Sequence, residues 1–382
     1  MSSRRQFLAQ LSVGVGAAAS VKIGMSAPLV AMAEPQWRMP AEEAPQERVF
    51  LAYAASTAVW RDWAGPVNRT VALLARTIAR YQPVTILCRQ AQEAEARRAC
   101  GNANIRYMPM PLDDIWVRDY GGCFVLGPDA QLALVDFNFN GWGRKQAFAA
   151  DTAVAKALSG DLQASYIRSR LIGEGGGIEV DGDGTAIITE SCWVNDNRNL
   201  GMSRGQVEAE LKSVLGLRKI IWLPGIKGRD ITDAHVDFYA RFASPGVVIA
   251  NLDNDPESYD FAVTRRHLEI LEAATDAAGR RLQVHTLSPP QAPRDNVYTR
   301  EADYAAGYIN FLPINGAVIA PEFGDAEADA RCRDLLKSLY PGREIVQLNI
   351  DPIAAGGGGI HCVSKNLPVF GGARRQLGVA GH

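Results

Sequence analysis

Short apolar runs alternate with segments of helical periodicity along most of the chain. Apolar runs of about four to six residues between turn residues are typical of buried strands. They occur at Val84–Leu87, Cys123–Leu126, Leu132–Phe137, Ala186–Thr189, Lys219–Leu223, Val247–Asn251 and Ala317–Ala320. Helical periodicity covers Val67–Tyr81, Asp151–Leu158, Gly205–Leu215, Glu257–Ala278 and Ala326–Leu336. The alternation predicts a mixed α/β protein, with no internal repeat that can be aligned by eye.

Composition narrows the function classes. The chain has 382 residues, of which 47% are hydrophobic and 21% charged, with a formal net charge of -2. These values describe a globular chain with a sizeable core, and the absence of a Lys/Arg block argues against nucleic acid as a partner. No long linker interrupts residues 34–382, so we predict one catalytic domain over that range.

The N-terminus has the pattern of a targeting segment. Arg4 and Arg5 precede a weakly apolar stretch that ends at Ala31-Met32-Ala33. This order is typical of a twin-arginine export signal, although two arginines before an apolar helix can also arise by chance. We predict a signal peptide over residues 1–33 with cleavage near Ala33, and a periplasmic or secreted protein. No later stretch is apolar and long enough to span a bilayer, so no membrane contact is expected after cleavage.

The six cysteines do not form a recognisable framework. They lie at Cys88, Cys100, Cys123, Cys192, Cys332 and Cys362, and no two form a C-x-x-C pair. This spacing supports neither a zinc cage nor an assignable disulfide pattern. We expect mostly buried thiols and no metal.

Cys362 follows a run of four glycines, Gly356–Gly359. Consecutive glycines allow close approach of a ligand to the backbone, so Gly357 and Gly358 are candidate substrate-binding residues. The segment then presents Cys362 as a nucleophile, whereas the alternative is a flexible loop beside an ordinary buried thiol. Adjacent side chains diverge in an extended segment, so His361 is a poor partner for Cys362.

Carboxylates concentrate in two further segments. Asp113, Asp114 and Asp119 stand close together with Trp116 and Arg118, and could hold a metal, hold a cation or form a surface ion pair. Glu174 directly precedes three glycines, where a ligand can come close.

The segment after those glycines contains Asp181-Gly182-Asp183-Gly184, which resembles a calcium loop only weakly. The position of the bidentate Glu is taken by Cys192. We therefore predict a hairpin turn here.

His235 and Asp237 stand two residues apart and would share one face of an extended segment. This places an acid–base group beside a carboxylate. A structural histidine and a metal ligand are alternatives, but no second histidine stands at ligand spacing. His235 is the better candidate partner of Cys362.

Together these segments resemble the agmatine deiminase family and the related bacterial-type (Porphyromonas-type) peptidylarginine deiminases of the guanidine-modifying pentein superfamily. The resemblance spans Arg48 to Pro368. Its motifs, in family order, are Asp114-x-Trp116-x-Arg118-Asp119, Phe139-Asn140-Gly141-Trp142-Gly143, Glu174-Gly175-Gly176, Asp233-Ala234-His235-Val236-Asp237 and Gly356 to Cys362.

The resemblance implies a five-bladed, pseudo-symmetric α/β propeller of ββαβ-type units around a central channel. It also implies a catalytic set of Cys362, His235, Asp119, Asp237 and Glu174, with no cofactor. The carboxylates would bind a guanidinium, Cys362 would attack its central carbon, and a covalent thiouronium would be hydrolysed. His235 would act as general acid and then as general base.

The implied partner is a small cationic guanidino substrate. Trp116, Trp142 and the acids Asp113 and Asp114 suit a diamine-like cation, which favours agmatine, converted with water to N-carbamoylputrescine, a polyamine precursor, and ammonia.

Several alternatives stay open. Peptidylarginine or free arginine would give citrulline, and export of the chain would suit such substrates. An amidinotransferase would use the same residues, whereas a guanidinium-binding or polyamine-binding protein would have no need of Cys362. Ala234 and Phe238 depart from residues common in the family. A homodimer is expected only from the frequency of dimers among soluble proteins.

Overall fold

The computed structural model describes residues 37–371. The chain divides by its contacts into Met1–Glu34 and Pro35–His382, and the predicted signal peptide lies outside the described residues. Within the described range, no helix has the length and apolar character that a membrane crossing requires. All six cysteines are described, and each is a buried free thiol, so the disulfide that the sequence left possible is not formed.

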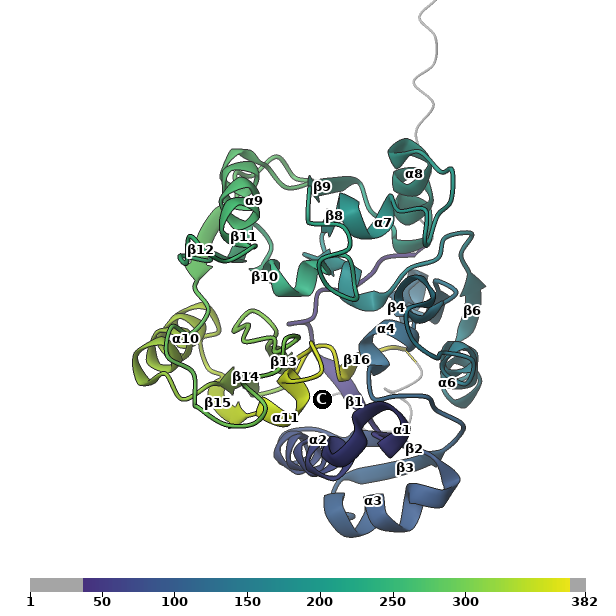
Figure 1. Cartoon of the computed structure of the whole chain (residues 1–382). Helices are drawn as coiled ribbons and strands as arrows, with labels where there is room; N and C mark the ends of the chain where they lie inside the picture. Colours follow the sequence, from purple (N-terminus) through teal and green to yellow (C-terminus); the bar gives the residue numbers. More distant parts are fainter. Residues whose placement is uncertain (1–36, 372–382) are drawn as a thin grey trace, which may run out of the picture. The chain divides into compact units, whose positions relative to one another are not determined.

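Five small sheets make up the unit Pro35–His382, and they follow one another around a common centre in chain order (Figure 1). The first sheet contains β16 (Ser364–Pro368), β1 (Gln46–Tyr53), β2 (Val84–Cys88) and β3 (Ile105–Pro109). The next two are β4 (Cys123–Leu126), β5 (Leu132–Asp136), β6 (Ser165–Arg168), and β7 (Glu179–Val180), β8 (Thr185–Thr189), β9 (Lys219–Leu223). The last two are β10 (Ala240–Ser244), β11 (Val247–Asn251), β12 (Gln283–Leu287), and β13 (Leu312–Ile314), β14 (Ala317–Glu322), β15 (Glu344–Asn349).

The sheets share one topology. In each, the inner strand pairs antiparallel with the next strand, which pairs parallel with a third. The parallel step needs a crossover, which contains a helix. These helices are α2 (Ala64–Ile78), α6 (Val154–Asp161), α8 (Arg204–Leu215), α9 (Phe261–Ala273) and α10 (Ala326–Leu339), with α3 (Glu93–Cys100) between β2 and β3. This repetition confirms the five-bladed α/β propeller.

Shorter helices occupy the connections. They are α1 (Thr57–Trp60), α4 (Val117–Tyr120), α5 (Gly141–Arg144), α7 (Glu190–Trp193) and α11 (Asp351–Ala354). Two 3-10 turns, η5 (Gly175–Gly177) and η6 (Val236–Phe238), lie just before β7 and β10. The prediction that His235 and Asp237 share an extended segment was therefore wrong, because Asp237 lies within a tight turn.

β1 and β16, the first and last strands of residues 37–371, belong to the same sheet and so complete the circle of modules. β1 pairs antiparallel with β16, from Gln46 opposite Pro368 to Leu51 opposite Ser364. All of β16 is buried, although Ser364, Lys365 and Asn366 are polar. The inner strands therefore carry polar side chains into the centre of the unit.

The apolar runs predicted as strands are all strands, because each of them is buried over most or all of its length. β5 and β8, for example, are buried along their whole lengths. The predicted helix Glu257–Ala278 is shorter than expected and ends at Ala273, because Thr275 then pairs with Arg281 in an isolated bridge.

The predicted hairpin is present where β7 turns into β8, with Glu179 opposite Ile187. Gly182 and Gly184 adopt φ of 70° and 87°, which a turn of this kind needs. Asp181 Oδ1 accepts hydrogen bonds from the amides of Asp183 (2.7 Å) and Thr185 (2.8 Å).

Candidate active site

The site is built from equivalent positions of the five modules. A polar residue lies shortly before the inner strand of each: Asp119 before β4, Glu174 before β7, His235 and Asp237 before β10, Asn310 before β13 and Cys362 before β16. The inner strand of each sheet lies nearest the common centre of the five sheets (Figure 1). The sheet topology therefore brings these side chains together from segments far apart in sequence.

Asp119 is held by two donors. Its Oδ2 accepts a hydrogen bond from the indole Nε1 of Trp142 (2.9 Å), and its Oδ1 accepts one from the amide of Gly176 (2.9 Å). His235 Nδ1 lies 3.7 Å from Asp119 Oδ1. The carboxylate is buried, so these contacts fix its plane toward the centre of the site.

Gly176 stands at the junction of the catalytic candidates. A Cβ at this position would lie 2.6 Å from His235 Nδ1, 2.8 Å from Asp119 Oδ1 and 3.1 Å from Asp237 Oδ2. Any side chain would push the histidine and both carboxylates apart. The glycines after Glu174 were expected to let a ligand come close to the backbone. The groups that come close to Gly176 are instead side chains of the protein.

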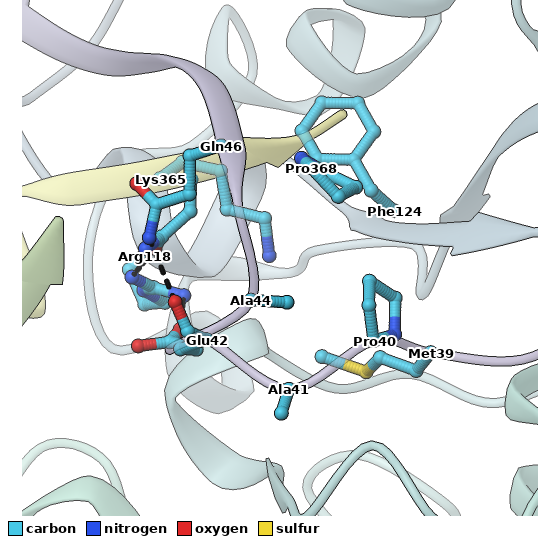
Figure 2. Close-up of a pocket in the computed structure, with 11 residues that line it drawn as sticks. Met39, Pro40, Ala41, Glu42, Ala44, Gln46, Arg118, Phe124, Lys365 and Pro368 are labelled. Carbon is cyan, nitrogen blue, oxygen red and sulfur yellow. Dashed lines mark hydrogen bonds and ion pairs between the residues drawn. The ribbon is translucent and has the colours of Figure 1, made fainter. Parts of the chain in front are cut away.

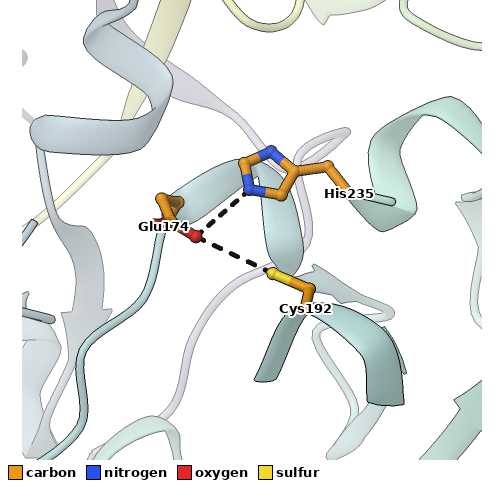
Figure 3. Close-up of side chains that lie close together, drawn as sticks. All are labelled: Glu174, Cys192 and His235. Carbon is orange, nitrogen blue, oxygen red and sulfur yellow. Dashed lines mark hydrogen bonds and ion pairs between the residues drawn. The ribbon is translucent and has the colours of Figure 1, made fainter. Parts of the chain in front are cut away.

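Glu174 contacts the imidazole of His235 and holds it in place (Figure 3). His235 Nε2 lies 3.2 Å from Glu174 Oε2, and Arg198 Nε donates to both oxygens of that carboxylate at 2.9 Å. Cys192 Sγ lies 3.7 Å from the same Oε2. Arg198, Glu174 and His235 are all buried, so they form a charge-paired cluster that holds the imidazole.

Ligand-type atoms of Glu174, Cys192 and His235 lie within 4.8 Å of one another, close enough to hold a metal ion. Arg198 already pairs with the Glu174 carboxylate, and a cation placed there would meet the charge of the guanidinium. We therefore interpret this cluster as support for His235 rather than as a metal centre.

Cys362 lies against Asp237 and Asn310. Its Sγ is 3.6 Å from Asp237 Oδ2 and 3.3 Å from Asn310 Nδ2. Within residues 37–371, the thiol makes no hydrogen bond with His235. His361 turns away and hydrogen bonds through Nδ1 to Asp237 Oδ2 at 2.7 Å. His361 is thus a partner of Asp237, in line with its poor fit as a partner of the thiol.

The other oxygen of Asp237 lacks a hydrogen-bond donor within residues 37–371. Oδ1 is buried and has no hydrogen-bond partner among the described residues. A buried carboxylate oxygen without a donor costs free energy, and native structures rarely keep one without a reason. Asp181 Oδ2, beside the turn between β7 and β8, is the other carboxylate oxygen in this state among the described residues. Asp237 differs from Asp181 because it lies against Cys362, so its Oδ1 is available to a donor from outside the protein.

A pocket opens onto Cys362. The described residues lining it are Trp116, Asp119, Trp142, Gln146, Ile231, Thr232, Gly356, Gly357, Gly358 and Cys362. It has indole walls, one carboxylate and no basic side chain. Asp237, His235 and Glu174 are not among its lining residues, although Asp237 contacts Cys362 directly. At Gly358 a Cβ would lie 2.2 Å from the Trp116 ring, so glycine lets this indole pack against the loop. Trp116, Trp142, Gly357 and Gly358 thus line the same pocket as Cys362.

Asp113 and Asp114 do not line this pocket. Asp114 Oδ1 accepts hydrogen bonds from the indole of Trp60 (2.6 Å), and its Oδ2 accepts from Trp116 (3.0 Å) and Gln146 (2.8 Å). Asp113 accepts one from the amide of Ala150 (2.7 Å). These two carboxylates hold the indoles and the loop in place, which corrects their predicted direct contact with substrate.

Electrostatics set the protonation states. Burial, followed by the charges of Asp237 and Asp119, raises the pKa of the Cys362 thiol well above its ordinary value. Burial lowers the pKa of His235, but Asp119 and Glu174 outweigh this and raise it well above its ordinary value. Burial raises the pKa of Asp119 to about 6, opposed by His235 and reinforced by Asp237. These shifts favour a thiol at Cys362 and an imidazolium at His235.

Three contributors were missed from the sequence. Asn310 donates to the sulfur, His361 binds Asp237 and Arg198 binds Glu174. Each is an isolated polar residue without a pattern of its own. For Asn310 a signal existed, because it directly precedes the apolar run of an inner strand, as the other site residues do.

A buried cysteine, a histidine and three carboxylates at the centre of a five-module α/β propeller define a class of cysteine-dependent enzymes. The family model described as Porphyromonas-type peptidyl-arginine deiminase matches residues 38–368. The chain belongs to this family, which confirms the resemblance found from the motifs.

Relatives cover nearly the whole chain. Agmatine deiminase of Pseudomonas aeruginosa (strain LESB58) is 35% identical over 352 residues, which cover 87% of this chain and 95% of the relative. Agmatine deiminase of Stutzerimonas stutzeri (strain A1501) is 36% identical over 350 residues, with 86% and 95% covered.

Solved structures agree with these matches. Agmatine deiminase of Enterococcus faecalis superposes with a TM-score of 0.82 at 31% identity, covering 87% of this chain and 96% of that one. A cysteine-to-serine variant of C. jejuni agmatine deiminase with substrate bound gives 0.77 at 25% identity, with 87% and 97% covered.

Proposed function

We propose that the protein is a cysteine-dependent guanidine deiminase that hydrolyses agmatine to N-carbamoylputrescine and ammonia. The observation that carries the proposal is the buried, unpartnered Oδ1 of Asp237, on the same carboxylate whose Oδ2 lies 3.6 Å from Cys362 Sγ. A guanidinium is planar, cationic and carries only donors, so it matches this acceptor and the carboxylate of Asp119.

Binding orients and activates the substrate. Asp119 and Asp237 accept hydrogen bonds from the guanidinium nitrogens, which directs the central carbon toward Cys362 Sγ. The substrate's positive charge also lowers the pKa of the thiol, because it offsets the two carboxylates that raise it. Deprotonation of Cys362 is thereby coupled to arrival of a cation.

Chemistry proceeds in two halves. The Cys362 thiolate forms an S–C bond to the guanidinium carbon, and the C–N bond of one terminal nitrogen breaks as His235 gives it a proton, so ammonia leaves. Water then adds to the carbon of the cationic thiouronium and gives up two protons, one to His235 and the other to solvent. The S–C bond breaks and returns the thiolate with a ureido product.

The pocket favours agmatine over arginine. None of the described residues that line it is basic, so the carboxylate of free arginine would find no charged partner there. Trp116 and Trp142 form apolar walls suited to the aliphatic chain of a diamine. The named agmatine deiminases at 35% and 36% identity support the same choice. Peptidylarginine, giving peptidylcitrulline, is the second candidate, because an internal peptide arginine also lacks a free carboxylate.

Ammonia release from agmatine, arginine and an internal-arginine peptide tests the proposal, with Cys362→Ala in parallel. We expect release from agmatine, loss of release in the variant, and retained binding of agmatine by calorimetry. Release from the peptide alone would reassign the substrate. No ammonia release from any of the three substrates would refute the proposed deiminase activity. Appreciable turnover by Cys362→Ala would exclude Cys362 as the nucleophile.

We also propose export through the twin-arginine route, which the order of arginines, apolar stretch and Ala31-Met32-Ala33 supports. Replacing Arg4 and Arg5 by Lys should retain the protein in the cytoplasm of a bacterial host, whereas unchanged fractionation would refute the proposal. The expected homodimer is tested by light scattering of the purified protein.

A further inference from the structure

A second pocket is lined by the segment before β1 together with residues of β4 and β16 (Figure 2). Glu42 from this segment, Arg118 and Lys365 are among its lining residues. Arg118 is the chain neighbour of Asp119, and Lys365 lies three residues after Cys362. Glu42 therefore reaches the inner side of the groups that form the active site.

Glu42 meets three cationic or ionisable groups at once. It forms a short ion pair with Arg118, a second with Arg241 at 2.6 Å, and its two oxygens each lie 3.0 Å from Nε2 of His361. Its side chain is only 12% exposed. Such an arrangement is far more specific than a surface ion pair.

Glu42 is the sole acidic partner of Arg118 among the described residues. The other side-chain contacts of Arg118 are with the His361 carbonyl (3.2 Å) and Asn366 Oδ1 (2.8 Å), both neutral. Arg241 keeps a second acid, Glu179, at 2.7 Å. Without Glu42, a buried guanidinium beside Asp119 would lack its counter-ion and would repel a cationic substrate.

Glu42 also acts on the state of His361. The Nδ1 of this ring faces Asp237 Oδ2 at 2.7 Å, while Nε2 faces Glu42. Both contacts are hydrogen bonds only when both nitrogens carry a proton, because carboxylates only accept. Burial, Arg118 and Arg241 lower the pKa of His361 below its ordinary value, and Glu42 and Asp237 oppose this only in part. Glu42 thereby increases the share of rings with a proton on both nitrogens, in which Nδ1 donates to Oδ2 and leaves Oδ1 of Asp237 for the substrate.

We propose that Glu42 is a positioning residue of the active site, acting through His361 on Asp237 and as the counter-ion of Arg118. The inference rests on the proposed guanidine substrate. It gives a functional role to the polar segment that precedes β1 in the sequence.

The decisive variant is Glu42→Gln, which keeps the shape and removes the charge. Glu43→Gln is the matched control, because Glu43 is adjacent and its side chain makes no hydrogen bond or ion pair within residues 37–371. At pH 8 we expect Glu42→Gln to raise KM for agmatine about tenfold or more, equivalent to about 1.4 kcal/mol. Glu43→Gln should stay within about twofold of wild type by the same measure.

A purely structural role is separated by ligand charge. The Kd of agmatine should rise in Glu42→Gln, while that of the neutral ureido product should change by less than about twofold. A general loosening of the site would weaken both ligands equally and would overturn the proposal. An unchanged KM in folded Glu42→Gln, checked by thermal unfolding, would also overturn it.

A double-mutant cycle tests the route through His361. In a His361→Asn background, Glu42→Gln should have a smaller effect on log KM than in wild type, since one of the two groups through which it acts is gone. Fully additive effects would refute the route.

If Glu42→Gln does not fold, Glu42→Asp decides. Glu42→Asp keeps the charge, so a KM for agmatine close to that of wild type supports the proposal, whereas a raised KM together with a raised Kd for the neutral product contradicts it. Wild-type enzyme that releases no ammonia from any guanidine would instead refute the proposed function.

Discussion

Replacing Asp237 by Asn should have opposite effects on the reactivity of Cys362 and on turnover. The carboxylate lies 3.6 Å from the sulfur and, after burial, is the first cause of the raised thiol pKa. The amide keeps nearly the same shape but removes the charge. The thiolate of the unliganded variant should therefore form at lower pH, while the guanidinium loses the acceptor that holds it.

The distance sets the size of the effect. Two unit charges 3.6 Å apart interact by about 4.6 kcal/mol at an effective dielectric constant of about 20 and by about 1.2 kcal/mol in bulk water. At about 1.4 kcal/mol per pKa unit, Asp237→Asn should lower the thiol pKa by about one to three units. Burial persists, so the pKa stays above its ordinary value. Loss of a buried charged acceptor should lower kcat/KM by at least about 30-fold, equivalent to about 2 kcal/mol.

The assay is alkylation by iodoacetamide as a function of pH, followed by intact mass, beside ammonia release. Cys362→Ala subtracts the reaction of the five other cysteines, which are buried. Asp334→Asn is the charge-matched control, because Asp334 is 75% exposed on α10. A thiol pKa in Asp237→Asn equal to or above that of wild type would refute the electrostatic argument, and unchanged turnover would place Asp237 outside the site.

The other predictions concern Asp119, Ala234 and His267. Asp119 must be ionised to bind a cation and has a pKa of about 6, so log kcat/KM should fall with acid below about pH 6, and this limb should disappear in Asp119→Asn; an identical limb would contradict the assignment. Ala234 adopts φ of 72°, so Ala234→Gly should relieve the backbone and raise the free energy of unfolding by about 0.5–1 kcal/mol, seen as a higher urea midpoint; a lower midpoint would mean that packing of the Ala234 methyl group is the larger effect and would contradict the prediction. Burial lowers the pKa of His267 to about 4, and unfolding restores it to about 6.5, so its contribution is complete above pH 6.5 and is lost as pH falls toward 4. Up to about 3 kcal/mol of unfolding free energy should disappear over that range in wild type but not in His267→Gln, measured by urea titration at both ends.

The strands that could be predicted are those with apolar surroundings on both faces. β5 and β8 are wholly buried and form continuous apolar runs. The outer strand β6 is largely exposed and the outer strand β15 is half-buried, and both are of mixed polarity, so no period marks them. β16 is buried yet polar, because its side chains face the charged centre rather than an apolar core.

The same difference applies to the site. Cys362, His235 and Asp119 stand in motifs that the sequence displays, and Ala234 marked a position whose left-handed backbone explains the preference for other residues there. Asp113 could not be separated from Asp119 by spacing, because only the fold decides which carboxylate turns toward the pocket.

Glu42 gave no sequence signal at all, because its side chain contacts residues at least 76 positions away. Long-range charge pairing of this kind follows from topology and not from local pattern.

The pairing of β1 with β16 has a consequence for biosynthesis. The first sheet cannot be completed until its partner strand has been made, after all four other modules. Cys362 lies two residues before that strand, so the nucleophile and the closing strand leave the ribosome together. A nascent chain that lacks them has an unpaired β1 edge, which is prone to wrong association. Catalytic activity and protection of that edge are thus acquired in one late step, and a chain that is active is also one whose synthesis has passed its last strand.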